Sequence, residues 1–143
     1  MNTLNFFHGA VLLKITNDNS VNFKKYQQNN SSYIINNNIG IYIKYSQKRI
    51  FPWVFSFSEV HIDEIKKFQN SINNIHIVLV CNDNGVCCLN FKEFCTVISI
   101  ENKCFPKWIK SSRSKGEKYS VSGSDGKLKH KIGSSDFPQK IYK

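Results

Sequence analysis

The stretch "SYIINNNIGIYIKYS", residues 32–46, decides the fold because it predicts two β-strands joined by a tight turn. Ile and Tyr dominate both halves of the stretch and favour extended structure. The asparagines at 36–38 tolerate the left-handed backbone conformations that a hairpin turn requires. In the second half, 39–46, isoleucines at alternate positions share one face, whereas Tyr42 and Lys44 share the other. We therefore expect a β-hairpin with Lys44 on the face opposite its isoleucines.

Helical and extended patterns alternate on both sides of this hairpin. Ser58 can cap a helix with one apolar stripe, and Asn90 with Glu93 has the spacing of a capping box. An N-terminal helix is favoured, although Gly9 and the run at 11–13 also allow a strand. A polar loop or irregular helix fills 17–32. In chain order, the pattern predicts a helix over 4–15, the hairpin, a third neighbouring antiparallel strand at 53–57, a helix at 58–71, a central strand at 75–80, a short strand at 86–89 and a short helix after residue 90.

These elements predict the α+β class: a mixed or mostly antiparallel sheet of about five strands packed against two or three helices. A chain of 143 residues is long enough for one core, which we assign to residues 1–105. Beyond that point, turn-forming residues and lysines dominate. Residues 106–143 are therefore expected to form a basic C-terminal β-hairpin or tail, with its turn at 122–126.

The chain carries a formal net charge of +10, which favours polyanionic partners in a salt-dependent manner. Residues 1–100 hold nine Lys or Arg and six Asp or Glu, a net charge of +3. Residues 101–143 hold eleven and four, a net charge of +7, so the basic footprint is mainly C-terminal. DNA or RNA is the first partner to expect, and an acidic protein is the second.

Targeting and metal-binding signals are weak in this sequence. The start "MNTLNFFHGAVLLKI" has no positive n-region, and its apolar run is interrupted, so we expect no membrane segment. Five cysteines, an odd number, fit a cytoplasmic protein better than a disulfide framework. Cys87 and Cys88 would point to opposite faces of a strand, and no C-x₂-C pair or nucleotide-binding motif is present. We expect no metal, no other cofactor and no catalytic cysteine.

The order of elements over roughly 4–100 resembles the core of the restriction-endonuclease-like superfamily, the PD-(D/E)XK nucleases. The resemblance is topological, and it implies an acid-x-Lys motif on the third strand that holds Mg²⁺. Lys44 matches the motif lysine, but Tyr42 stands where the acid should be, and no Asp or Glu lies between Asp18 and Glu59. Unless Asp18, Glu59 or Asp83 converges on Lys44, the resemblance implies the fold without the nuclease activity.

Two groups of residues are candidates for binding nucleic acid. Lys44 is either a solvated lysine lying over an aromatic ring or a phosphate contact, and the C-terminal lysines either bind a phosphate backbone or only keep a tail soluble. Trp108 and Tyr119 are available either to stack on bases or to pack against the protein. The first group comprises Tyr42, Lys44, Lys48 and Arg49. The second comprises Lys107, Lys110, Arg113, Lys115, Lys118, Lys127, Lys129 and Lys131, of which the last three share one predicted strand face.

The sequence therefore favours a non-enzymatic nucleic-acid-binding protein that contacts the phosphate backbone through a basic face. A role as an accessory of a phage, a mobile element or a defence system fits its small size and basicity. One alternative is an interaction or inhibitor module that docks on an acidic or nucleic-acid-binding protein. The other is a divergent metal-dependent endonuclease, which would need carboxylates near Lys44.

Overall fold

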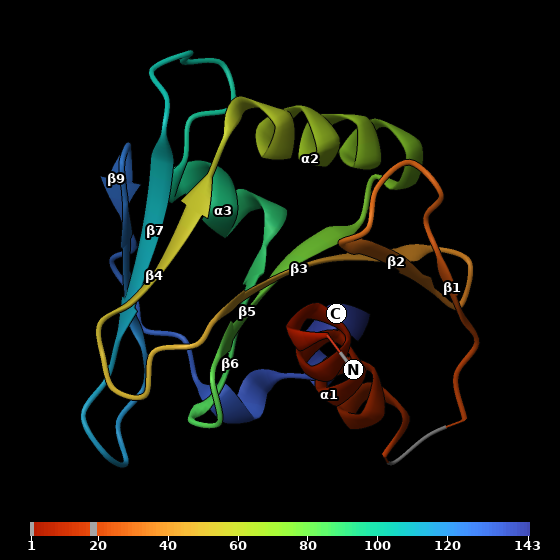
Figure 1. Cartoon of the computed structure of the whole chain (residues 1–143), viewed down its shortest axis with the longest axis horizontal. Coiled ribbons are helices and arrows are strands. Elements are labelled where there is room, and N and C mark those ends of the chain that lie inside the picture. Colours follow the sequence, from red (N-terminus) through yellow and green to blue (C-terminus); the bar gives the residue numbers. More distant parts are fainter. Residues whose placement is uncertain (1, 18–19) are drawn as a thin grey trace.

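The computed structural model describes residues 2–17 and 20–143 and confirms the α+β class, with two sheets (Figure 1). The first sheet has the strand order β1-β2-β3-β5-β6. β3 and β5 are parallel, and the other neighbours are antiparallel. Its strands are β1 (Phe23–Lys25), β2 (Ser32–Ile35), β3 (Ile39–Ser46), β5 (Ile75–Cys81) and β6 (Gly85–Asn90). The predicted hairpin at 32–46 is thus confirmed as β2 and β3, and β5 is central, whereas β1 was not predicted.

The second sheet is antiparallel with the order β4-β7-β8-β9. Its strands are β4 (Trp53–Phe57), β7 (Lys107–Ser112), β8 (Ser120–Gly123) and β9 (Gly126–Lys127). The prediction that the strand at 53–57 joins the hairpin as a third neighbour is wrong. β2 and β5 flank β3 on its two sides, so β4 leaves the first sheet and pairs with β7 instead.

Three α-helices begin at the caps that the sequence contains. α1 (Thr3–Thr16) is capped by Asn2, α2 (Glu59–Ile72) by Ser58 and α3 (Phe91–Val97) by Asn90. Both hydrogen bonds of the predicted capping box are present: the Asn90 side chain accepts from the Glu93 amide, and the Glu93 side chain accepts from the Asn90 amide. Two short 3₁₀ helices, η1 (Ser134–Asp136) and η2 (Gln139–Tyr142), end the chain. Among the described residues, no helix is both long and apolar enough to cross a membrane.

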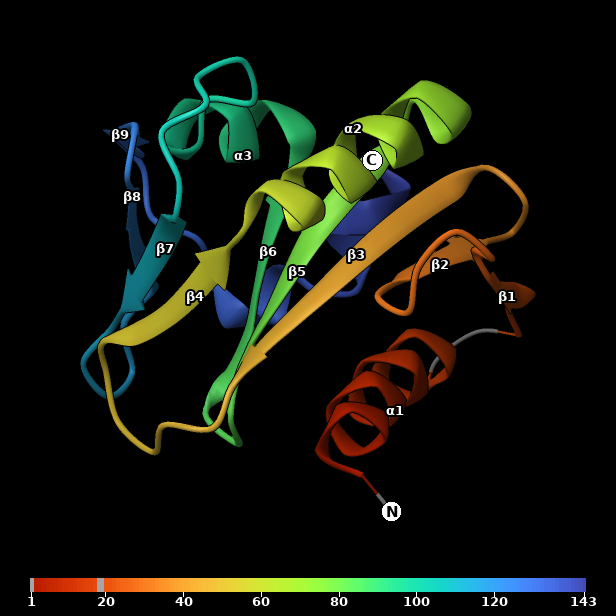
Figure 2. The same ribbon diagram turned by 45° about the horizontal axis from the view of Figure 1, so that its top comes forward.

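The first sheet separates two apolar cores. α1 and η2 cover one face, and α2, α3 and the second sheet cover the other (Figures 1 and 2). Because both faces are covered, β2 and β5 are buried over their whole lengths, and β3 is buried over its first five residues. The core on the α1 side includes Phe7, Val11, Ile41, Val78 and Ile141, and the core on the α2 side includes Tyr42, Phe55, Ile65, Leu79 and Ile109.

The C-terminal segment is integrated into both cores. Tyr119, Val121 and Ile132 pack in the core on the α2 side, and Phe137 and Ile141 pack beneath α1. The expected boundary near residue 105 falls between α3 and β7, but side chains on both sides of it share the same cores. The expected basic hairpin is β8 and β9, although β9 contains only two residues.

Candidate nucleic-acid interface

The second sheet turns one face to solvent, and strand register identifies the residues on it. Buried and exposed side chains alternate along β4 and β7, so the exposed ones point away from the core. Lys110 pairs with Val54 on one side and with Ser122 on the other. Ser122 in turn pairs with Lys127, which brings two predicted lysines onto one side of the sheet. We call this surface the outer face; it comprises Val54, Ser56, Trp108, Lys110, Ser112, Ser120, Ser122 and Lys127.

Trp108 gives the outer face an exposed aromatic ring. The residue is 37% exposed, and the Nζ atom of Lys110 lies 5.5 Å from its ring centroid. The backbone beneath it is held by Ser124, whose Oγ accepts from the Trp108 amide at 2.8 Å. A cation beside an indole on an open sheet can contact a phosphate while the ring stacks on a base.

The β3–β4 and β7–β8 loops meet at one end of the second sheet (lower left in Figure 1). A hollow of about 330 Å³ lies between residues of these two loops. It joins a predicted residue of the first group, Arg49, to Arg113 and Lys115 of the second. The sequence places these residues more than sixty positions apart. We call this hollow the loop pocket; it is lined by Arg49, Ile50, Phe51, Trp53, Asn84, Arg113, Lys115 and Gly116.

Arg113 organises the loop pocket. Its Nε and Nη2 donate to the side-chain and backbone oxygens of Asn84 at 2.7 and 2.8 Å. Its Nη1 donates to Ser134 Oγ at 2.9 Å, and the guanidinium carbon lies 4.5 Å from the centroid of the Tyr119 ring. Tyr119 is buried and donates to Asn84, so of the two roles considered from the sequence, stacking or packing, it has the packing role and supports Arg113.

Most of the predicted cations lack a carboxylate partner. In the described part of the chain, the ion pairs are those of Lys107 with Asp125 and of Lys140 and His130 with Glu93. Ten cations of the predicted site are therefore uncompensated at contact distance. They are Lys44, Lys48, Arg49, Lys110, Arg113, Lys115, Lys118, Lys127, Lys129 and Lys131. All of these but Lys44 and Arg113 are exposed.

Lys107 does not belong to the interface. Its side chain is fully buried, and Nζ donates to Asp125 Oδ2 at 2.7 Å. Burial opposes ionisation of Asp125, but the hydrogen bonds from Lys107 and the Ser99 amide outweigh it and lower the pKa of that carboxyl. Side chains alternate between the two faces of the strand at 107–112, and Lys107 lies on the inward side with Ile109. The predicted contact of Lys107 with nucleic acid is therefore wrong.

The prediction that Tyr42 belongs to the nucleic-acid-binding surface is also wrong. The strand that carries it is buried on both faces, and its side chain is fully inside the core. Its hydroxyl donates to Glu64 Oε1 at 2.7 Å, and burial together with this bond raises its pKa. Tyr42 therefore cannot contact a nucleic acid, and it occupies the one carboxylate that α2 directs towards β3.

Lys44 lies in a second hollow, of about 470 Å³, whose lining includes residues of α1, β3, β4 and α2. Its Nζ is 3.4 Å from Nδ1 of His61 and 5.1 Å from the centroid of the Phe57 ring. Lys44 is half-buried with its ammonium over the Phe57 ring, so it makes the aromatic contact considered from the sequence but is less solvated than a surface lysine. We call this hollow the Lys44 groove; it is lined by Leu4, His8, Ser31, Ile43, Lys44, Tyr45, Val54, Phe55, Ser56 and His61.

The carboxylates that the nuclease resemblance requires do not gather at Lys44. Glu59 is exposed at the start of α2, and Asp83 is exposed in the β5–β6 turn; neither lines the groove. Asp18 lies outside the described residues. Within residues 2–17 and 20–143, no group of three or more His, Cys, Asp and Glu side chains could hold a metal ion.

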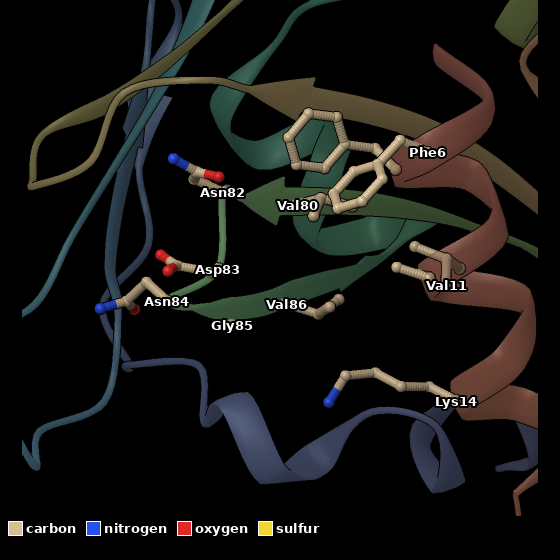
Figure 3. Close-up of a pocket in the computed structure, with 11 residues that line it drawn as sticks. Phe6, Val11, Lys14, Val80, Asn82, Asp83, Asn84, Gly85 and Val86 are labelled. Carbon is tan, nitrogen blue, oxygen red and sulfur yellow. The ribbon is translucent and has the colours of Figure 1, made fainter. Parts of the chain in front are cut away.

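A third hollow, of about 310 Å³, separates α1 from the β5–β6 turn. Phe6 and Val11 of α1 face Val80 and Val86 across it (Figure 3). Its walls are apolar, and polar groups such as Lys14 stand at its edge. Its chemistry suits an apolar ligand and not a phosphate backbone.

Several interface residues were not predicted from the sequence. Ile50 and Phe51 are 68% and 48% exposed beside Arg49, although apolar residues there suggested only a turn into a strand. Asn84 was assigned to a turn, and its role in holding Arg113 depends on a contact 29 residues away. The signal for Phe51 was available, because an aromatic residue two positions after Arg49, beside two cations, is a stacking pattern.

No protein family, no curated protein and no solved structure matches this chain significantly.

Proposed function

We propose that this protein binds single-stranded nucleic acid on the outer face and in the loop pocket. The observation that carries the proposal is the set of uncompensated cations on these surfaces, interleaved with the exposed rings of Trp108 and Phe51. Lysines without carboxylate partners attract phosphates and release counterions on binding. Exposed aromatic rings stack on bases only where those bases are unpaired.

The geometry favours backbone contacts over base-specific readout. Lys110 and Lys127 are the cross-strand partners of Ser122 on its two sides, and the Ser122 hydroxyl between them is a hydrogen-bond donor. Such groups bind phosphate oxygens and carry little sequence information. Lys48 and Lys118 are exposed in the β3–β4 and β7–β8 loops and extend the positive surface next to the loop pocket. We therefore expect similar affinity for different sequences of the same length.

The test is fluorescence anisotropy with labelled single strands of about 16 nucleotides, DNA and RNA, and a duplex of equal length. Binding to single strands should weaken steeply between about 50 and 200 mM salt, with a log–log slope near −0.7 for each phosphate contacted. The duplex should bind more weakly than either single strand, because its bases cannot stack on Trp108. Absence of binding at low salt to every probe would refute the proposal.

Two double variants distinguish binding at the outer face from attraction by the net charge of the protein. K110A with K127A removes two lysines from the outer face, and K66A with K67A removes two lysines from α2. The first should lower affinity at least tenfold, whereas the second should change it little. Equal losses would show that the net charge alone attracts nucleic acid.

A further inference from the structure

The Lys44 groove contains a cation in an unusual setting. Lys44 has no carboxylate at ion-pair distance in the described part of the chain, and its nearest polar partner is the Nδ1 atom of His61 at 3.4 Å. That imidazole nitrogen already accepts a hydrogen bond from the Ser58 amide, at 3.1 Å. A lysine ammonium has three donors, so the groove leaves part of its hydrogen-bonding capacity unused.

The one nearby carboxylate is engaged elsewhere. Glu64 influences Lys44 through space, but its Oε1 accepts from the buried Tyr42 hydroxyl at 2.7 Å. No Asp or Glu lines the groove. Its polar lining consists of Lys44, two imidazoles, and the hydroxyl residues Ser31, Ser56 and Tyr45. A hollow with a cation, hydroxyl donors and no acid has the chemistry of an oxyanion site.

The groove also continues the proposed interface. Ser56 and Val54 line it and at the same time belong to the outer face. Ser56 is the cross-strand partner of Trp108, and Val54 is that of Lys110. Cross-strand partners lie about 5 Å apart, so a nucleotide whose base stacks on Trp108 could extend over β4 to the groove.

We propose that the Lys44 groove binds a phosphate group, with Lys44 as its cation and the side chains of Ser56 and Ser31 as hydrogen-bond donors. That the phosphate belongs to a nucleic-acid strand rests on the proposed function. That the groove binds a phosphate group at all does not rest on it. A free or terminal phosphate is the other source of the same group.

Phosphate binding at this site is coupled to a proton. Burial lowers the pKa of Lys44, an effect that Glu64 partly opposes, and a bound anion would raise that pKa again. The other titratable groups around the groove are His8 of α1, Tyr33 of β2, Tyr42 and Tyr45 of β3, and His61 of α2. Burial lowers the pKa of His8 to about 4, and burial and Lys44 lower that of His61. Both imidazoles are therefore mostly uncharged at neutral pH, so the binding of an anion depends on the positive charge of Lys44.

The experiment follows the Lys44 side chain by NMR in the full chain labelled at lysine, titrated with inorganic phosphate and with a thymidine decamer that lacks terminal phosphates. Both ligands should raise the titration midpoint of Lys44. K44M should lose at least tenfold in phosphate affinity, K44R should retain most of it, and K67M on α2 should match the wild type. Both K44M and K67M should keep the backbone spectrum of a folded protein.

The outcomes separate the two proposals. If phosphate leaves the Lys44 signal unchanged, or binds K44M as well as the wild type, the groove assignment is wrong. If the decamer binds with salt dependence but never moves Lys44, the groove assignment for the strand fails while the proposed function stands. If inorganic phosphate moves Lys44 and no oligonucleotide binds, the groove is a free-phosphate site and the proposed function is wrong.

Discussion

Glu93 shows how one side chain can join distant parts of this chain. Its Oε1 accepts from the Asn90 amide at 2.9 Å and lies 2.8 Å from Nζ of Lys140, and its Oε2 lies 2.6 Å from Nε2 of His130. The carboxylate therefore caps α3 and binds the segments on both sides of η1. Burial opposes its ionisation, but the bonds from Lys140, His130 and Asn90 outweigh burial and lower its pKa.

Glu93→Gln should therefore destabilise the protein and change how its stability depends on pH. A lowered folded pKa means that the carboxylate contributes stability above its ordinary value of 4.5, and that this contribution is lost as pH falls through the folded value. The loss at pH 7 should be about 3 kcal/mol, because a largely buried ion pair is broken. Urea unfolding at pH 7 and about pH 3.5 measures both effects; a variant that loses as much stability in acid as the wild type would contradict the assignment.

Lys44→Met should have the opposite effect on stability. Because burial lowers the pKa of Lys44, its ammonium is less favourable in the folded than in the unfolded state. The destabilisation is complete below the folded pKa and disappears as pH rises to the ordinary value of 10.5. At pH 7 the variant should unfold at a higher urea concentration than the wild type, and the difference should shrink towards pH 10. Equal midpoints at pH 7 would show that Lys44 is adequately solvated.

At the scale of elements, the β8–β9 turn depends on a close approach to α3. A Cβ atom added to Gly123 or Gly126 would collide with the backbone carbonyls of Val97 and Thr96. The Asp125 amide donates to the Val97 oxygen at 3.0 Å, and Asp125 accepts from the Ser99 amide at 2.7 Å. These two hydrogen bonds therefore anchor the hairpin to the end of α3, and the lack of side chains at Gly123 and Gly126 permits the close approach.

Gly123→Ala should destabilise the protein by about 2 kcal/mol, since the helix end must shift to admit the methyl group. Gly9→Ala is the matched control, because nothing lies within 4 Å of a Cβ at this position inside α1. That change should instead stabilise the protein by about 0.5–1 kcal/mol, as alanine favours helix over glycine. The two urea midpoints should move in opposite directions; a neutral Gly123→Ala would refute the close contact.

The elements that could be predicted are those fixed by local chemistry. The asparagines at 36–38, the Ser58 cap and the Asn90–Glu93 box act within a few residues, and each produced the expected turn or helix start. The partner of β4 could not be predicted, because Phe55 pairs with Ile109 and no local pattern specifies a strand 54 positions away.

The candidate site was predicted only in part for the same reason. Lys110 and Lys127 were identified as basic residues, but register alone shows that both flank Ser122 on one face. Tyr42 looked accessible because period-two alternation cannot reveal that a strand is covered on both sides. Arg49 and Arg113 meet only through the packing of two loops.

At the scale of the whole molecule, both apolar cores contain residues from before and after position 105. β4 shares the core on the α2 side with the first sheet, and its only strand partner among the described residues is β7. Phe137 and Ile141 fill the opposite core beneath α1. Both cores are therefore incomplete without residues 106–143.

A fragment of residues 1–105 should accordingly fail to fold. It would expose Phe55 and Phe57 by removing Ile109 and Val121 from the core on the α2 side. We expect poor dispersion in its ¹H–¹⁵N spectrum and no cooperative urea transition, in contrast to the full chain. A well-dispersed spectrum with a sharp transition would establish residues 1–105 as an independent domain.

The pairing of β4 with β7 also sets an order of events during translation. Residues 32–46 and 75–90 can form their part of the first sheet as soon as they leave the ribosome, whereas β4 waits until residue 112 has been made. During that interval the aromatic face of β4 has no strand beside it, and long-range pairing of this kind forms slowly. We therefore expect the nascent chain to expose the aromatic side chains of β4 until β7 is available to pair with it.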